Sequence, residues 1–381
     1  MNYFLNRISF ELFIMNTYIA HLDQIESWFF TLTEKQRFFL PKKTDGSNYR
    51  FELLASKGSE NNHSIDLLSY KPTILPPGKN IFPDGEVLFS YHKDEQGHYH
   101  FTQGSNIEHQ ILAGVRACDL KGIYLMDAAF SDGIKDTHYL QRREKTNIIA
   151  FNCLSPCDKQ CFCETAQSLD FQDGADIFIT PLLKNEQCLI EVLTSAGSAL
   201  IQNLSSEKCI NPASVKEQAL ANRPKPFGRQ FIAPVEQLSK VIHDEDADKI
   251  YQQYAERCFS CGTCNLVCPT CYCFETKDDF ELDSALEKGS GNKVRHWDSC
   301  MNPGFAEVSG GHNFRAEPAA RQRHRIRRKF DYLPQRFDQT FCTGCGRCGR
   351  QCTTGIDIFD IVNDVYLSSP LASKSEQESD R

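Results

Sequence analysis

The chain has 381 residues, a formal net charge of −8 and 18 cysteines. This length is enough for two or three domains, and the acidic balance argues against bulk nucleic-acid binding. Cysteines gathered at short spacings in so large a chain indicate bound metal rather than a disulfide framework, so we expect a reducing, cytoplasmic setting.

The N-terminal residues do not predict an export signal or a membrane segment. Residues 1–14 contain Arg7 and Glu11 and lack a small-residue cleavage site. No stretch approaches ~20 consecutive apolar residues, so we expect no membrane span. Met15 begins a more ordinary sequence, and either Met1 or Met15 can be the true start. We expect residues 1–14 to be a disordered extension.

Residues 15–205 predict a mixed α/β domain. Apolar side chains recur at helical spacing from Leu22 to Leu32. Further along, strands alternate with a helix that starts near Cys118, which favours an open α/β sheet. The strands are expected at residues 86–91, 111–115, 147–151, 176–180 and 188–192.

Two of these strands end in cysteines. Cys118 follows the strand at 111–115, and Cys153 follows the strand at 147–151. If the two strands are neighbours, these ends lie at the sheet edge where ligands bind in open α/β folds. Single buried cysteines are common in cores, which explains Cys188 and Cys209 well.

The cysteines after the second strand follow a C-x3-C-x3-C-x-C pattern, which core packing explains poorly. We therefore predict a third iron–sulfur cluster in this domain. Its expected ligands are Cys118, Cys153, Cys161 and Cys163. Cys157 is expected to be a spare or substitute ligand.

Residues 206–243 are polar and interrupted by prolines, and we expect them to form a linker. A C-terminal domain is expected at residues 244–365, beginning with a helix up to residue 257. Residues 366–381 are polar and aperiodic, which indicates a disordered tail.

The C-terminal domain contains two cysteine runs of the form C-x2-C-x2-C-x3-C. This spacing binds [4Fe-4S] clusters in bacterial ferredoxins, where the fourth cysteine of each run ligates the other cluster. Zinc sites typically use C-x2-C pairs, so two identical triplet runs leave zinc as a minor alternative. The predicted ligands of cluster 1 are Cys258, Cys261, Cys264 and Cys352. Those of cluster 2 are Cys342, Cys345, Cys348 and Cys268.

The two runs are far apart for a ferredoxin, and we expect a long helical insertion at residues 274–341. Cys271, Cys273 and Cys300 lie in or beside it and could bind another metal together with His312. The favoured interpretation is that these residues pack around the clusters and adjust their reduction potentials.

The region from Arg295 to Arg350 has eleven Arg and Lys against five Asp and Glu, a net of +6 in an acidic chain. Arg321, Arg325 and Arg328 fall on one helical face. Such a face can be solvated, can offset negative clusters and dock an acidic partner, or can bind nucleic acid. We favour the second interpretation, because no aromatic interleaving or nucleic-acid motif accompanies the charges.

With these residues, the chain resembles the beta subunit of cytoplasmic sulfhydrogenases, and it is similar to the related electron-transfer subunit of anaerobic sulfite reductase. The resemblance covers about residues 70 to 360. It departs from the family pattern at Thr353, where proline is usual, and at Cys157, which is usually not cysteine. The shared motifs are Gly-Val-Arg-x-Cys-Asp-Leu at 114–120, Arg142-Arg143-Glu144, Asn152-Cys153, Cys161-Phe162-Cys163, both ferredoxin runs, Trp297-Asp298-Ser299-Cys300 and Gly310-Gly311-His312-Asn313-Phe314-Arg315.

The resemblance implies a subunit with no nickel site or flavin of its own. It implies electron relay between the small and large subunits of a nickel–iron hydrogenase and a flavin- and NAD(P)-binding reductase subunit. In the sulfite-reductase relatives, the acceptor is a sirohaem subunit instead.

The first hypothesis is therefore a non-catalytic electron-transfer subunit of an oxidoreductase complex. No Walker loop, dinucleotide fingerprint or nucleophile motif is found, so we assign no catalytic residue. A second hypothesis is an enzyme in which the third cluster has an open iron for a small sulfur species. A third is a metal-sensing or structural module.

Overall fold

The computed structural model describes residues 16–46, 48–55, 70–104, 107–182, 186–243, 247–280 and 289–372. The expected extension at 1–14 and the part of the expected tail from 373 to 381 lie outside the described residues.

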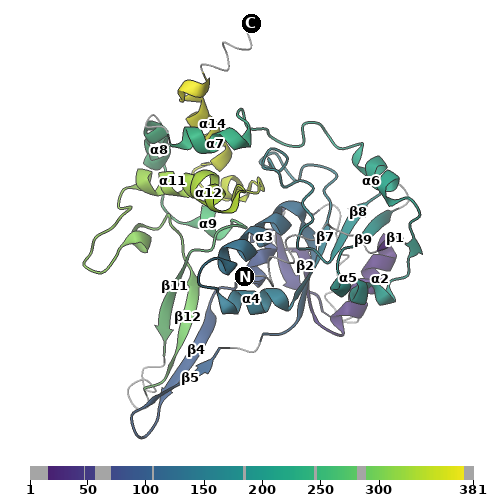
Figure 1. The fold of residues 1–381 in the computed structure, drawn as a ribbon, viewed down its shortest axis with the longest axis horizontal. Coiled ribbons are helices and arrows are strands. Elements are labelled where there is room, and N and C mark those ends of the chain that lie inside the picture. Colours follow the sequence, from purple (N-terminus) through teal and green to yellow (C-terminus); the bar gives the residue numbers. More distant parts are fainter. Residues whose placement is uncertain are drawn as a thin grey trace.

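An eight-stranded sheet forms the centre of the N-terminal part (Figure 1). Its strand order is β10-β1-β9-β8-β7-β6-β2-β3. The four consecutive strands from β8 to β2 in this order run parallel to one another. The expected strands are present, and β6 and β7 pair directly. The strands are β1 Asn16–His21, β2 Arg37–Lys43, β3 Tyr49–Leu53, β6 Gln110–Arg116, β7 Thr146–Phe151, β8 Ile177–Pro181, β9 Gln187–Val192 and β10 Glu207–Lys208.

Helices cover both faces of this sheet. Alternate residues of a strand point to opposite faces, so Ile111 of β6 packs with α2 (Leu22–Thr33), whereas Leu112 packs with α3 (Ala117–Ser131) and α4 (Thr137–Glu144). The side of the sheet that carries α2 also receives Leu200, the last residue of α5 (Ser195–Leu200). Short 3-10 turns complete this part at η1 Pro77–Asn80 and η2 Ile201–Asn203.

A second, four-stranded antiparallel sheet extends from the body of the molecule (Figure 1). It combines β4 (Glu86–Lys93) and β5 (Tyr99–Gln103) with β11 (Phe274–Asp279) and β12 (Gly291–Trp297). The insertion at 274–341 therefore begins with a hairpin that pairs with the N-terminal part. It continues through η3 Pro303–Ala306 and is helical from α11 onwards, with α11 Pro318–Arg327, the π-helical turn η4 Arg328–Tyr332 and α12 Leu333–Phe337.

The C-terminal part is a helical layer with its own apolar core. α7 (Val235–Ile242), α8 (Ala247–Glu256) and α14 (Ile358–Leu367) pack against α11 and η4. Residues 206–243, which we expected to link the domains, contain β10, α7 and α6 (Pro212–Leu220), and α6 packs on β8 and β9.

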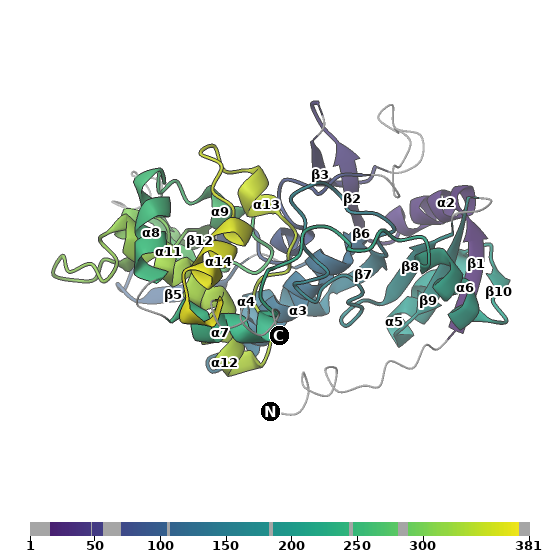
Figure 2. The same ribbon diagram turned by 90° about the horizontal axis from the view of Figure 1, so that it is seen from above.

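Seen from above, the eight-stranded sheet lies at one end of the molecule and the C-terminal helices at the other (Figure 2). Between them lie two one-turn helices, α9 (Thr263–Leu266) and α13 (Arg347–Arg350). Both belong to the cysteine runs, so the metal sites lie where the two parts meet. Among the described residues, no helix has the length and apolar character needed to cross a membrane.

Candidate metal centres

The first cysteine run folds as a loop that enters α9. Ser260 and Gly262 both have left-handed backbone conformations, with φ of 55° and 78°, and they turn the chain around the cysteines. Gly262 also packs closely on the turn after β12, because a Cβ there would lie 2.8 Å from Cβ of Ser299. The loop encloses a cavity lined by the four predicted cluster 1 ligands Cys258, Cys261, Cys264 and Cys352.

Arg325 of α11 lines the same cavity and is only 2% exposed. Its Nε and Nη2 are buried and have no hydrogen-bond partner among the described residues. A buried guanidinium needs a nearby anion, and a thiolate-ligated iron–sulfur cluster supplies negative charge and sulfur acceptors. The four thiols and the unsatisfied guanidinium therefore fit a [4Fe-4S] cluster held by Cys258, Cys261, Cys264 and Cys352.

The second run repeats the local fold of the first. Gly346 has φ of 72° and precedes α13, as Gly262 precedes α9. Cys268 lies close enough to this run to raise the pKa of its cysteines, although burial is the largest cause of each increase. The predicted cluster 2 set is thus brought together as Cys268, Cys342, Cys345 and Cys348.

The third group of cysteines lies at the carboxyl ends of β6 and β7. These strands are parallel, with Arg116 opposite Phe151, so the residues that follow them are neighbours. One cavity at this edge is lined by Cys118, Cys153, Cys157, Cys161 and Cys163. Cys345 of the second ferredoxin-type run lines it as well, so the third site adjoins the second.

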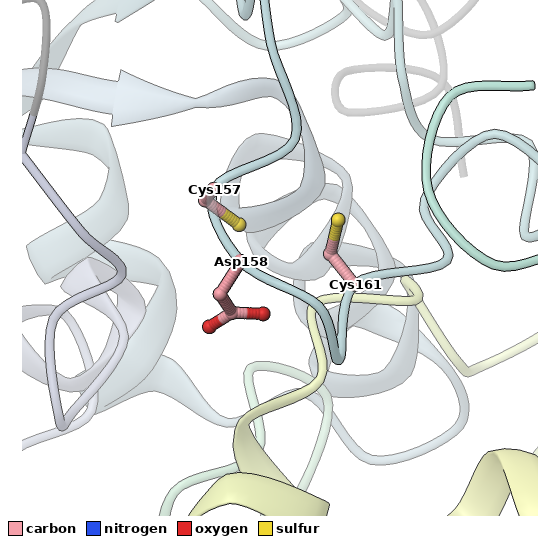
Figure 3. A group of neighbouring side chains, drawn as sticks. All are labelled: Cys157, Asp158 and Cys161. Carbon is pink, nitrogen blue, oxygen red and sulfur yellow. The ribbon is translucent and has the colours of Figure 1, made fainter. Parts of the chain in front are cut away.

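Cys157 lies in the same group of cysteines as the four predicted ligands of the third site. Its Sγ, the Sγ of Cys161 and a carboxylate oxygen of Asp158 all lie within 4.8 Å of one another, with the two thiols directed toward each other (Figure 3). Asp158 already accepts a hydrogen bond from Nε of Arg350 at 2.6 Å. Apart from Cys345 of the second run, five thiols thus line a cavity in which a cluster needs four ligands.

Two cations border the third cavity. The guanidinium of Arg116 lies 4.2 Å from the ring centroid of Tyr70, and its Nη1 is 4.0 Å from Sγ of Cys153. On the other side, Arg347 is paired with Asp119. Because Asp119 offsets the charge of Arg347, the positive charge beside the thiols that suits an anionic cluster comes from Arg116.

The pKa of each of these thiols is raised, so they carry protons in the absence of metal. Burial is the largest cause for Cys118 and Cys153, and a hydrogen bond with Cys161 is the largest cause for Cys157. The pKa of Cys118 is well above its ordinary value, and that of Cys161 rises to about 11, where a hydrogen bond with Cys157 opposes one with Cys163. Metal binding has to displace these protons. The sites are thus built for strong thiophilic centres.

Buried cations lie beside the cysteine sites, and the sequence analysis identified them only in part. Arg321 and Arg325 were expected on one face with Arg328, and the buried face is instead Arg321, Arg325 and Lys329. Its spacing of four residues could have been read from the sequence. On the face that could be solvated, Arg323 is half-buried and pairs with Asp248.

The remaining cysteines in and beside the insertion also come together. The thiols of Cys273 and Cys300 form a hydrogen bond, and one amide, that of Asn265, contacts the sulfurs of Cys271 and Cys300. His312 does not join them. It lies on an exposed turn, with its ring against Phe314 at a centroid distance of 4.8 Å.

Comparison with known proteins agrees with this arrangement. Residues 257–356 match a family described as a 4Fe-4S dicluster domain. The chain is 29% identical over 357 residues to Sulfhydrogenase 2 subunit beta from Pyrococcus furiosus, which covers 91% of this chain and 97% of that protein. No solved structure matches the chain significantly.

The chain is therefore an iron–sulfur protein that resembles, along nearly its whole length, a sulfhydrogenase beta subunit. Its fold is confirmed as mixed α/β with a dicluster domain in the C-terminal part. Iron–sulfur chemistry and the role of an electron-transfer subunit follow from the domain that holds the two cysteine runs.

Proposed function

We propose that this chain relays electrons through three [4Fe-4S] clusters between a nickel–iron hydrogenase module and a flavin- and NAD(P)-binding reductase subunit in the cytoplasm. The main observation behind the proposal is that three cysteine-lined sites adjoin one another. A bound [4Fe-4S] cluster takes up and releases one electron at a time. The protein's own task is to hold these groups close, shielded from water and balanced in charge.

The residues between the sites support a single path. Cys345, a predicted cluster 2 ligand, lines the third cavity next to Cys118. At the other end, Arg325 lines the cluster 1 cavity and acts electrostatically on Cys268 and Cys348 of the second site. The proposed order is thus the third site, then cluster 2, then cluster 1.

The cluster 1 site supports a point of exchange with a partner. Cys261 is exposed, and the neighbouring Phe259 is 74% exposed, although it lies within the ligand run. An aromatic side chain beside a redox site offers apolar contact area to a docking protein. The third site lies at the opposite end of the path and would face the second partner.

The proposed domain arrangement follows from the same contacts. Residues 15–205 form the α/β domain with the third site, and residues 244–365 form the ferredoxin-like domain. The pairing of β4 with β12 supports a rigid attachment between them, because it joins strands from both parts in one sheet.

One observation favours a second candidate function, the reduction of a small sulfur species at the third site. Besides Cys345, which is assigned to cluster 2, five cysteines line that cavity, so one thiol remains beyond the four that a cluster needs. The full chain with reconstituted clusters, supplied with an artificial reductant, tests this directly. Turnover of polysulfide or sulfite by the chain alone would replace the relay proposal, whereas no turnover supports it.

The partners are tested by isolating the tagged chain from its own cells under anaerobic conditions. Co-purification of nickel and flavin in fixed ratio to the chain is expected. Sirohaem in their place would select an anaerobic sulfite reductase as the complex. A chain that carries neither nickel, flavin nor sirohaem would contradict relay in either complex.

A further inference from the structure

We propose that Cys271, Cys273 and Cys300, which none of the three predicted clusters uses as ligands, hold a further thiophilic metal centre beside Cys268 of the second site. The relay proposal does not require this centre. The inference also replaces the packing role that the sequence favoured for these cysteines.

The β11–β12 hairpin brings two of the three thiols together. Cys273 precedes β11, and Cys300 lies just after β12. The hairpin is closed by the pair Phe274 and Trp297 and by the hydrogen bond from the Asp298 amide to the Cys273 carbonyl at 3.0 Å. Both the thiol and the backbone N–H of Cys300 donate to the Cys273 sulfur. The pairing of β11 with β12 therefore fixes the relative position of Cys273 and Cys300.

The third thiol is held against the pair by Asn265 of α9, which is only 1% exposed. Nδ2 of Asn265 donates to Sγ of Cys300 at 3.1 Å, and Oδ1 accepts from Sγ of Cys271 at 3.6 Å. The same Nδ2 donates to Oγ of Ser299 at 2.9 Å. One short amide group therefore spans the distance between the sulfurs of Cys271 and Cys300.

A buried cation next to these thiols needs negative charge. Nζ of Lys329 donates to Sγ of Cys271 at 3.5 Å and to Sγ of Cys268 at 3.3 Å. Its other hydrogen bonds go to neutral oxygens, those of Thr270 and Phe341, at 2.8 and 3.3 Å. Lys329 is 5% exposed. Among the described residues its acceptors include no carboxylate, so the balancing charge has to come from thiolates.

Ordinary packing does not account for this group. A structural buried cysteine behaves as a small hydrophobe in apolar surroundings. Here the sulfurs contact an amide, a backbone N–H and an ammonium, which are the groups found around metal-bound thiolates. A metal deprotonates its cysteine ligands outright, so a thiolate of Cys271 would add to the negative charge that Cys268 already places beside Lys329.

The donor set defines the class of metal. Thiolates select zinc, or iron together with sulfide, over hard cations such as magnesium or calcium. Since Cys268 is assigned to cluster 2, three thiolates remain, and a tetrahedral centre takes its fourth donor from sulfide or water. Zinc and iron–sulfur occupants share this chemistry and differ in metal and sulfide content.

The test measures iron, zinc and acid-labile sulfide per chain in the anaerobically purified full-length protein. Cys271→Ser, Cys273→Ser and Cys300→Ser are compared with Cys188→Ser and Cys209→Ser, two buried cysteines that lie in and next to the eight-stranded sheet. Each of the first three variants is expected to lose one centre, seen as one zinc or as about four irons with their sulfide. The controls are expected to keep the wild-type content. Unchanged metal in all three variants, in chains that keep their ferredoxin-type spectra, would overturn the proposal.

A measurement on the wild-type chain keeps the proposal testable if the variants do not fold. Anomalous difference maps at the iron and zinc edges are expected to show a peak among the sulfurs of Cys271, Cys273 and Cys300. A map without such a peak would overturn the proposal, and so would a disulfide between Cys273 and Cys300.

Discussion

Arg347 and Asp119 form a buried bidentate ion pair that joins the second cysteine run to the α/β domain. Nη2 of Arg347 lies 2.8 Å from Oδ2 of Asp119, and Nε donates to the Thr73 carbonyl at 2.7 Å. Asp119 is next to Cys118 and Arg347 is two residues after Cys345, so the pair lies between the two proposed cluster sites. It fixes how the two parts of the chain meet.

Removing one partner of this pair should destabilise the protein strongly. In Arg347→Met, the carboxylate of Asp119 stays buried without its counter-ion, which costs about 3–5 kcal/mol. We expect a lower thermal midpoint of the anaerobic, metal-loaded protein. The double variant Arg347→Met/Asp119→Leu is expected to lose less than the sum of the two single variants. Strict additivity of the three midpoints would show that the pair is not coupled.

Gly344 should tolerate no side chain, because it combines a left-handed conformation with close packing. Its φ is 65°, and a Cβ would lie 2.5 Å from the carbonyl oxygen of Phe162 in the third-site loop. Gly355 has φ of 66° and open space around it, so Gly355→Ala measures the conformational cost alone, about 1–2 kcal/mol.

Gly344→Ala is expected to cost about 1–3 kcal/mol more than Gly355→Ala, since the two loops have to separate. Thermal midpoints of both variants, measured side by side, give the comparison. Equal midpoints would mean that the contact between Gly344 and Phe162 contributes nothing.

Lys329 should raise the reduction potential of the group bound by Cys268. Its ammonium lies 3.3 Å from that sulfur in a buried position, and a cation stabilises the form with the added electron. In Lys329→Met we expect a potential lower by roughly 60 mV, a tenfold change in the one-electron equilibrium.

Lys329→Arg keeps the charge and should stay near the wild-type potential. Potentiometric titration followed by electron paramagnetic resonance gives both values. An unchanged or higher potential in Lys329→Met would contradict this role of the ammonium.

Cys157 should be dispensable at the third site, where Cys118, Cys153, Cys161 and Cys163 are the predicted ligands. Cys157→Ser is expected to keep its iron, and Cys163→Ser is expected to lose one cluster, about four irons. The two residues line the same cavity, so the variants are matched in place and chemistry. The opposite pattern would make Cys157 a ligand and Cys163 the spare.

Much of this arrangement could be predicted from the sequence, because its signals are local. Spacing alone indicated the two ferredoxin-type runs, and short apolar runs indicated the strands β6 and β7. That these strands are neighbours was only a condition of the third-site prediction, and the structure shows that they pair. Once those strands are neighbours, Cys118 and Cys153 have to lie at one edge of the sheet.

The parts that could not be predicted depend on contacts between distant residues. The pairing of β4 with β12 joins Glu86 to Arg295 in a buried ion pair, and neither segment alone indicates it. The hairpin β11–β12 lies in a segment that was expected to be helical. From the sequence, Cys271, Cys273 and Cys300 were expected to pack around the clusters. Their sulfurs are brought together by that hairpin and by Asn265, contacts that the sequence does not indicate.

The relay account depends most on the third site, and the cluster content of Cys118→Ser tests it directly. Iron and acid-labile sulfide per chain are measured in the wild type, in Cys118→Ser and in the control Cys209→Ser. The account predicts that Cys118→Ser has about four irons and four sulfides fewer than the wild type, with both ferredoxin-type signals kept, and that Cys209→Ser is unchanged. Equal iron and sulfide in Cys118→Ser and the wild type would contradict it.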